Sequence, residues 1–185
     1  PFLFYFAGNV IWSYFAVCIS TTSGTFTKNS DIFGKVYFPR ITVPISNVII
    51  GLMQFLIQFI LFLCFLFYFY TKGLDIRLNF SLLFIPFLLL QVALMSLGFG
   101  VLISALTSKY RDLTFAMTFG VQLWMYATPI VYPLSIVPDK YKILFVLNPM
   151  TSVVESFRYI FYHESIIELK YIIISIFITL LICFF

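Results

Sequence analysis

The sequence predicts an all-α fold, a polytopic bundle of transmembrane helices. Hydrophobic residues make up 62% of the 185-residue chain and charged residues 10%, and the mean hydropathy is +1.07. A soluble domain of this size could not bury so much apolar side chain. Apolar runs long enough to cross a bilayer also follow one another along the chain. We therefore expect one transmembrane domain over residues 1–185.

The charges and cysteines argue against several other classes of function. The net charge of +4 is small and dispersed, so nucleic acid is not an expected partner. The cysteines lie in separate apolar runs, without the spacing of a metal or disulfide framework. We expect neither a metal nor a cofactor.

The first expected span, about residues 2–20, begins directly at Pro1. No basic region precedes it and no cleavage site follows, so it does not read as a signal peptide. We expect the chain to be a fragment without its N-terminal part.

A polar segment, residues 27–44, separates the first span from the second at about 45–70. Pro39 and Pro44 favour extended backbone before them and so divide a short helix from the next span. The segment is either an exposed docking loop or an ordinary connection. The eleven basic residues divide almost evenly between the two membrane sides. Their greater density in segments 21–44 and 107–114 favours the cytoplasm for that side.

The third and fourth spans carry different signals. In the third, at about 82–106, Ser96, Gly100 and Ser104 form a seam of small residues that permits close helix contact. The fourth run, 114–135, is broken at Pro129 and Pro133. The unbroken helix before the break would be about 21 Å long, too short to cross a core of about 30 Å. It is either completed after a kink or turns back as a re-entrant element.

A last helix is expected before the final span at about 171–185. Asn148 and Pro149 are typical of a helix start, with Asn as the N-cap and Pro in the first turn. Glu155 and Arg158 form a pair at i, i+3. We expect this helix to lie in the membrane interface or to dip into it.

The expected spans contain no Asp, Glu, Lys, Arg or His. A proton-coupled carrier or a membrane hydrolase normally places such groups inside its bundle. The sequence also lacks the glycine-rich loop that cradles ATP phosphates. A partner would therefore supply the energy, although sodium-driven transport through carbonyls and hydroxyls stays open.

Four motifs, in order, resemble one family. They are residues 29–44, Ser108–Asp112, Thr128–Pro133, and Asn148–Met150 followed by Glu155, Phe157 and Arg158. Together they resemble the membrane subunit of polysaccharide-exporting ABC transporters of the ABC-2 class, which move O-antigen, capsule or teichoic acid chains. That family has six spans, so the resemblance implies that an N-terminal amphipathic helix and the first span are missing here.

The resemblance implies a cytoplasmic coupling helix, and re-entrant external helices before the last span. It implies a permease without its own ATP site in the bacterial inner membrane, paired with a second copy and with two ATP-binding subunits. The cargo would be a lipid-linked glycan. Contact with the ATP-binding subunit would fall to Lys28, Asn29, Asp31, Lys35, Phe38, Pro39 and Arg40. The re-entrant gate would contain Pro129, Pro133, Asn148, Pro149, Glu155 and Arg158.

Aromatic rings suit a sliding polymer, because sugar faces stack on them without a fixed hydrogen-bond register. The candidate channel residues are Tyr5, Trp12, Trp124, Tyr126 and Tyr132. These rings could instead form belts where the bilayer meets water. Two other functions stay open: a polytopic membrane transferase acting on lipid-linked sugars, and an ABC-2 permease for a drug or small lipid.

Overall fold

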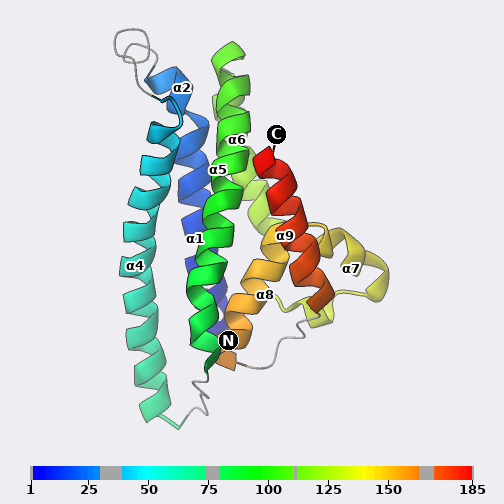
Figure 1. The fold of residues 1–185 in the computed structure, drawn as a ribbon. Helices are drawn as coiled ribbons and strands as arrows, with labels where there is room; N and C mark the ends of the chain where they lie inside the picture. Colours follow the sequence, from blue (N-terminus) through cyan, green and yellow to red (C-terminus); the bar gives the residue numbers. More distant parts are fainter. Residues whose placement is uncertain (1, 30–38, 74–79, 111, 163–168, 185) are drawn as a thin grey trace.

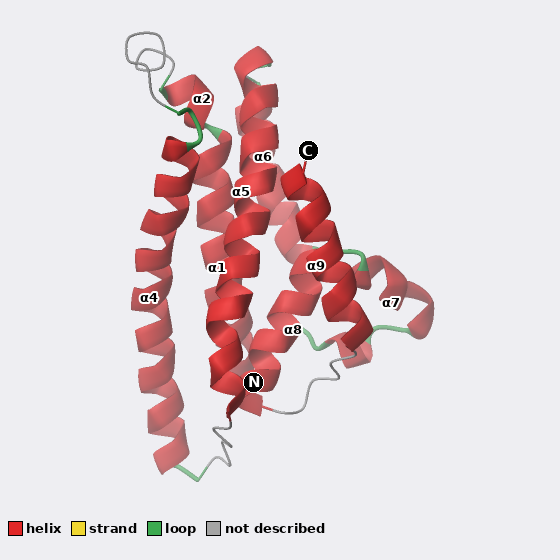
Figure 2. Ribbon diagram, viewed as in Figure 1, coloured by secondary structure: helices red, strands yellow, loops and turns green. Residues whose placement is uncertain are grey.

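The computed structural model describes residues 2–29, 39–73, 80–110, 112–162 and 169–184. Within these ranges the chain is helical and contains no strand, which confirms the predicted all-α class (Figure 2). The elements are α1 (Phe2–Ser23), α2 (Thr25–Lys28), α4 (Thr42–Thr71), η1 (Phe80–Phe84), α5 (Ile85–Lys109), α6 (Leu113–Tyr126), η2 (Leu134–Ile136), α7 (Asp139–Val146), α8 (Pro149–Tyr162) and α9 (Leu169–Phe184).

Among the residues that the structure describes, three helical segments are long and apolar enough to cross a membrane: α1, α4, and η1 with α5. The expected spans 2–20, 45–70 and 82–106 fall within them. Helix α4 lies at the edge of the bundle (Figure 1), and large apolar side chains such as Ile50, Ile57 and Phe67 are exposed along it. Such a surface is stable only in lipid, so the chain is a multi-pass integral membrane protein.

The fourth apolar run does not form one long helix. Helix α6 ends at Tyr126, and a non-helical segment follows through Pro133, which includes both prolines of the expected break. Beyond η2 and α7, α8 packs among α1, α5 and α9 (Figure 1). Because residues 149–158 are all buried, α8 is a core element and does not lie flat on the bundle surface.

Helix α1 occupies the centre of the bundle and contacts α4, α5, α6 and α8. Against α5, Gly100 brings the two backbones so close that an added Cβ would lie 2.5 Å from Cβ of Thr22. Further along, Ser104 Oγ accepts a hydrogen bond of 3.0 Å from the Phe26 amide. Thr107 Oγ1 donates one of 3.0 Å to the Ser23 carbonyl. The seam of small residues predicted on the third span is therefore the contact of α5 with α1 and α2.

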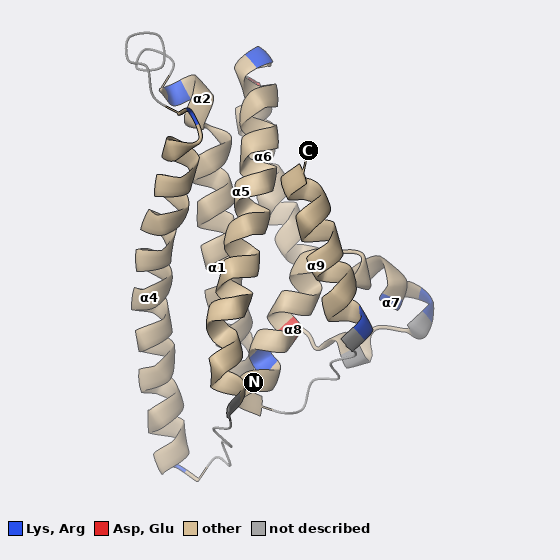
Figure 3. Cartoon of the chain, viewed as in Figure 1, with Lys and Arg blue, Asp and Glu red and all other residues tan. Residues whose placement is uncertain are grey.

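Most charged positions among the described residues lie toward the ends of the helices, as the coloured ribbon of Figure 3 shows. Lys28, Arg40 and Lys109 lie at one end of the bundle, and Lys72 lies at the far end of α4. The exception is α8, which carries an acidic and a basic side chain inside the bundle (Figure 3).

Replacing Gly100 by alanine is expected to lower the free energy of unfolding by about 1–3 kcal/mol, the usual cost of overpacking a tight contact. Denaturant titration of the purified chain in detergent micelles measures it. Gly120→Ala is the matched control, because an added Cβ at Gly120 meets nothing within 4 Å. Equal stability losses in the two variants would contradict the close packing of α1 on α5.

Candidate functional site

The site is built around the Arg158 side chain, which is fully buried on α8. Its Nη1 donates to the Pro129 carbonyl at 2.7 Å and to Glu155 Oε1 at 3.3 Å. Its Nε donates to the Phe4 carbonyl at 3.2 Å, and its Nη2 donates to the Ile130 carbonyl. One guanidinium group therefore joins α8 to the start of α1 and to the segment that follows α6. The planar fork of arginine suits this use, because it directs several donors at fixed angles.

Helix α1 leaves room for the guanidinium group through Gly8. A Cβ added at Gly8 would lie 2.5 Å from Nη2 of Arg158. The ring of Phe4 lies under the group, with its centroid 3.8 Å from Cζ of Arg158. A cation over an aromatic face is attracted by the ring quadrupole, most strongly when water is excluded. We refer to Phe4, Gly8, Pro129, Ile130 and Glu155 as the Arg158 cage.

The electrostatics of the cage depend on Glu155, which is 5% exposed. Helix α8 lies outside the three spanning segments. Burial raises the pKa of Glu155, and the charge of Arg158 and a backbone hydrogen bond from Leu134 oppose that rise. A buried ion pair contributes little net stability, but removing one partner strands the other charge and costs about 3–5 kcal/mol. The pair therefore fixes the position of α8 more than it stabilises the fold.

Asn148 joins the end of α6 to the start of α8. Its Oδ1 accepts from the Met150 amide at 3.1 Å, which confirms the predicted N-cap. The same oxygen accepts from Trp124 Nε1 at 3.0 Å. Its Nδ2 donates to Thr128 Oγ1 at 2.9 Å and, more weakly, to the Ala127 carbonyl at 3.4 Å. The segment on each side of the break in the fourth run is thus tied to α8: residues 124–128 through Asn148, and residues 129–130 through Arg158.

The remaining residues expected in the gate lie next to these. Pro149 is buried at the first position of α8. Pro133 is half-buried and directly precedes η2. Neither proline donates a backbone hydrogen bond, which suits the start of a helix and a break in one.

The five expected channel aromatics differ in how much ring surface they present. Tyr5 is 40% exposed and Tyr126 is 73% exposed. Trp12 is 4% exposed, and its ring centroid lies 5.4 Å from that of Phe15. Trp124 is half-buried, and its ring centroid lies 5.2 Å from that of Phe15 and 5.0 Å from that of Phe99. Tyr132 is half-buried and contacts Phe145.

Part of the expected coupling segment can be placed. Asp31, Lys35 and Phe38 lie outside the described residues. Lys28 ends α2, and Asn29 follows as its C-cap, with Nδ2 donating to the Thr25 carbonyl at 2.9 Å. Pro39 and Arg40 are exposed, just before α4. These placed residues lie at the same end of the bundle as Lys109 (Figure 1).

Sequence reasoning found Glu155 and Arg158 as a pair but missed the other partners of Arg158. Backbone carbonyls leave no trace in residue type, so Phe4 and Ile130 gave no signal. Gly8 could have been suspected, because a lone glycine in an apolar helix often marks a close approach. Among the described residues, no group of three or more His, Cys, Asp or Glu could hold a metal.

The family model and the relatives that match this chain describe the same class of membrane protein. Residues 2–162 match the family model for the ABC-2 type transporter. The chain is 30% identical over 171 residues to an O-antigen export system permease protein RfbA of Klebsiella pneumoniae, an alignment that covers 92% of the chain and 64% of that protein. It is 27% identical over 170 residues to the protein of the same name from Myxococcus xanthus, covering 90% of the chain and 62% of that protein. The chain thus spans less than two thirds of the length of these relatives.

Replacing Arg158 by lysine is expected to lower the apparent melting temperature of the purified protein by about 5 °C or more, because a single ammonium cannot donate at once to the carbonyl and carboxylate acceptors of the cage. Thermal unfolding in detergent measures this. Glu155→Gln with Arg158→Gln should recover part of the loss, since it leaves no unpaired charge. If R158K melts as the parent does, the guanidinium geometry is not needed.

Proposed function

The chain belongs to the ABC-2 type transporter family, and from that premise we propose that it is the permease subunit of an ATP-driven exporter of a lipid-linked polysaccharide. The observation that carries the proposal is the alignment of 92% of the chain with a protein named as an O-antigen export permease. The multi-pass helical architecture of the chain agrees with a location in the bacterial inner membrane. The charge-free spans and the missing ATP-phosphate loop support an external source of energy.

The energy would arrive at the end of the bundle that contains α2 and Arg40. Helix α2 follows α1 directly, and Arg40 directly precedes α4. The Phe26 amide binds Ser104, and Asn47 Nδ2 donates to Thr25 Oγ1 at 3.1 Å. A partner that pushes on this surface would therefore move α1, α4 and α5 together. We propose that this partner is an ATP-binding subunit, and that the complex contains two copies of it and two copies of this chain.

The opposite end would form the external gate. Helix α6 is too short to cross, and Asn148 and Arg158 hold α8 against the broken run that follows α6. We propose that α7 and α8 are the re-entrant helices, with the Arg158 cage as the fixed point of the gate. The buried, capped position of α8 supports this assignment.

The glycan would pass along exposed aromatic rings. Tyr126 and Tyr5 present the most surface in a single subunit, whereas Trp12 and Trp124 pack on neighbouring aromatic rings. Helix α6 also exposes polar side chains, Thr118 and Gln122, beside Phe119. The Thr118 hydroxyl donates to the Thr114 carbonyl within the helix. An exposed amide such as that of Gln122 is costly in contact with lipid, which supports a second copy or a hydrated conduit on this face.

Reversing the charge of Arg40 with R40E is expected to lower both export and transport-linked ATP hydrolysis by about 5-fold or more, the lower end of ordinary coupling between sites. Surface glycan display and ATPase assays of the reconstituted complex measure the two. Lys72→Glu, at the other end of α4, is the matched control and should leave ATP hydrolysis unchanged. If only K72E uncouples the complex, the orientation is reversed and the proposed docking end is wrong.

Replacing Tyr126 by alanine should lower the export rate by about 2- to 10-fold, because one ring stacking contact is worth about 0.5–1.5 kcal/mol. Tyr126→Phe should retain most of the rate, since it keeps the ring. Tyr68→Ala removes a ring that is 55% exposed on the outer helix α4 and should export normally. Equal losses in Y126A and Y68A would assign both rings to interfacial belts.

A further inference from the structure

A second polar connection reaches the start of α8, and it comes from α5 and α9. Gln91, on α5, is 5% exposed, and Ser175, on α9, is fully buried. Gln91 Nε2 donates to Ser175 Oγ at 2.7 Å, and Ser175 Oγ donates to the Pro149 carbonyl at 2.8 Å. Three helices therefore meet at one hydroxyl group: α5, α9 and, through its first residue, α8.

The chemistry of these groups fixes the direction of both hydrogen bonds. A carbonyl can only accept, so the single proton of the Ser175 hydroxyl goes to Pro149. The hydroxyl oxygen then accepts from Gln91, which must present its NH2 group. A displacement of about 1 Å between α5 and α8 would weaken one of the two bonds. The two bonds together therefore define the position of α5 against the start of α8.

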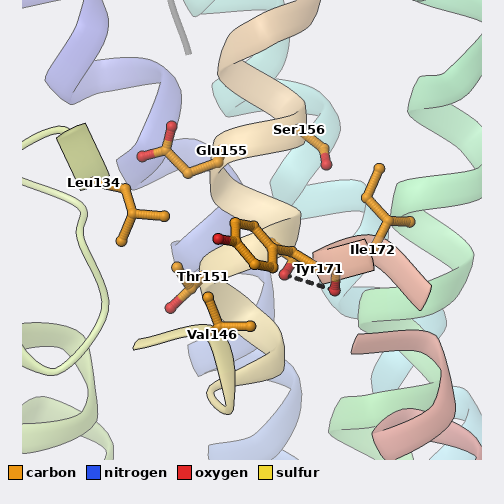
Figure 4. A pocket seen from close by; sticks show the side chains of 8 residues that line it. Leu134, Val146, Thr151, Glu155, Ser156, Tyr171 and Ile172 are labelled. Atoms are coloured by element: carbon orange, nitrogen blue, oxygen red, sulfur yellow. Dashed lines mark hydrogen bonds between the residues drawn. The ribbon is translucent and has the colours of Figure 1, made fainter. Parts of the chain in front are cut away.

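Helix α9 is also bound to both neighbours beyond Ser175. Ser152 of α8 donates to the Tyr171 carbonyl at 3.0 Å, the dashed line in Figure 4. This bond lies one turn before Ser175 on α9, so α8 and α9 share two contacts. On the side of α5, a Cβ added at Gly98 would lie 2.9 Å from Ile182 Cγ2. Close packing of this kind holds the three helices together around Ser175.

The opposite end of α5 lies at the proposed docking end. There the Ser104 hydroxyl accepts from the Phe26 amide. One turn later, the Thr107 hydroxyl donates to the Ser23 carbonyl. Helix α5 therefore contacts α1 and α2 at one end and the start of α8 at the other. Packed protein interiors have low compressibility, so a displacement of one end is passed to the other.

We propose that Gln91 and Ser175 are positioning residues through which α5 sets the position of the proposed gate. When the docking end is moved, α5 carries the start of α8 with it, because the Ser175 hydroxyl joins the two. Asn148 holds α8 to α6 and Arg158 holds it to α1, and Ser175 supplies the link to α5. This inference rests on the proposed function as an ATP-driven exporter.

Ser175→Ala removes both hydrogen bonds and is tested in the full transporter with its ATP-binding partner. S175A is expected to lower the amount of glycan exported per ATP hydrolysed by about 3-fold or more, the effect of losing one hydrogen bond between membrane helices. Gln91→Leu should lower this ratio in the same way. The double variant should be no worse than S175A alone, because both changes break the same chain of bonds.

Thr179→Val is the matched control. Thr179 is 2% exposed on α9, and its hydroxyl donates to the Ser175 carbonyl of the same helix at 2.8 Å. T179V therefore removes a buried hydroxyl from α9 without breaking a hydrogen bond between helices. It should leave the ratio of export to ATP hydrolysis unchanged.

Amide hydrogen exchange at the start of α8, measured with and without ATP, gives a readout that does not depend on the cargo. A nucleotide-dependent change that is present in the parent and T179V and lost in S175A and Q91L supports the proposal. Export and ATP hydrolysis that fall together with the melting temperature, at an unchanged ratio, would show a purely structural contact and overturn it. Additive losses in the double variant would overturn it too.

Failure of the proposed function would look different. A parent complex that hydrolyses ATP and exports no glycan contradicts the assigned cargo alone, and the exchange measurement then decides whether Gln91 and Ser175 position α8.

Discussion

The enclosure of one arginine by backbone carbonyls is the constraint on which the rest of the structure depends. In a bilayer no water is available to satisfy broken backbone, so a helix can be interrupted only where other groups replace its hydrogen bonds. The carbonyls of Pro129 and Ile130 lie in such an interruption, and Arg158 donates to both of them. The break after α6 and the burial of α8 are therefore two parts of one arrangement. Each depends on the other, because the same guanidinium group makes both contacts.

Helix α1 connects this arrangement to the opposite end of the bundle. At its start, the Phe4 carbonyl and Gly8 contact Arg158. At its end, Thr22 packs on Gly100, and the Ser23 carbonyl accepts from Thr107. Close packing of small residues leaves little space to absorb a shift, so a displacement at α2 is transmitted along α1 as a rigid element. This gives the proposed coupling surface and the proposed gate a continuous physical connection.

Much of the fold could be predicted from the sequence because its signals are local. Apolar length identified α1, α4 and α5, and the small residues around Gly100 identified a helix contact. The Asn148 cap follows from residue type and position alone. The depth of α8 could not be predicted, because its partners are far apart in sequence: Arg158 meets Phe4 across 154 positions. The burial of Trp12 could not be predicted for a related reason, since a ring that lines a conduit and a ring that fills a core look alike in sequence.

The buried pair on α8 also bears on how the bundle is powered. Charge-free spans argue for an external energy source, and an ionisable pair inside the bundle could seem to reverse that argument. Arg158 does not reverse the argument, because its Nε, Nη1 and Nη2 atoms all donate to carbonyl or carboxylate oxygens. Glu155 in turn is held by Arg158 and Leu134. A group that carries a coupling ion must release its partner in each cycle, and releasing either charge here would strand the other in a low-dielectric interior. The pair is therefore suited to a fixed joint and not to the carriage of a coupling ion.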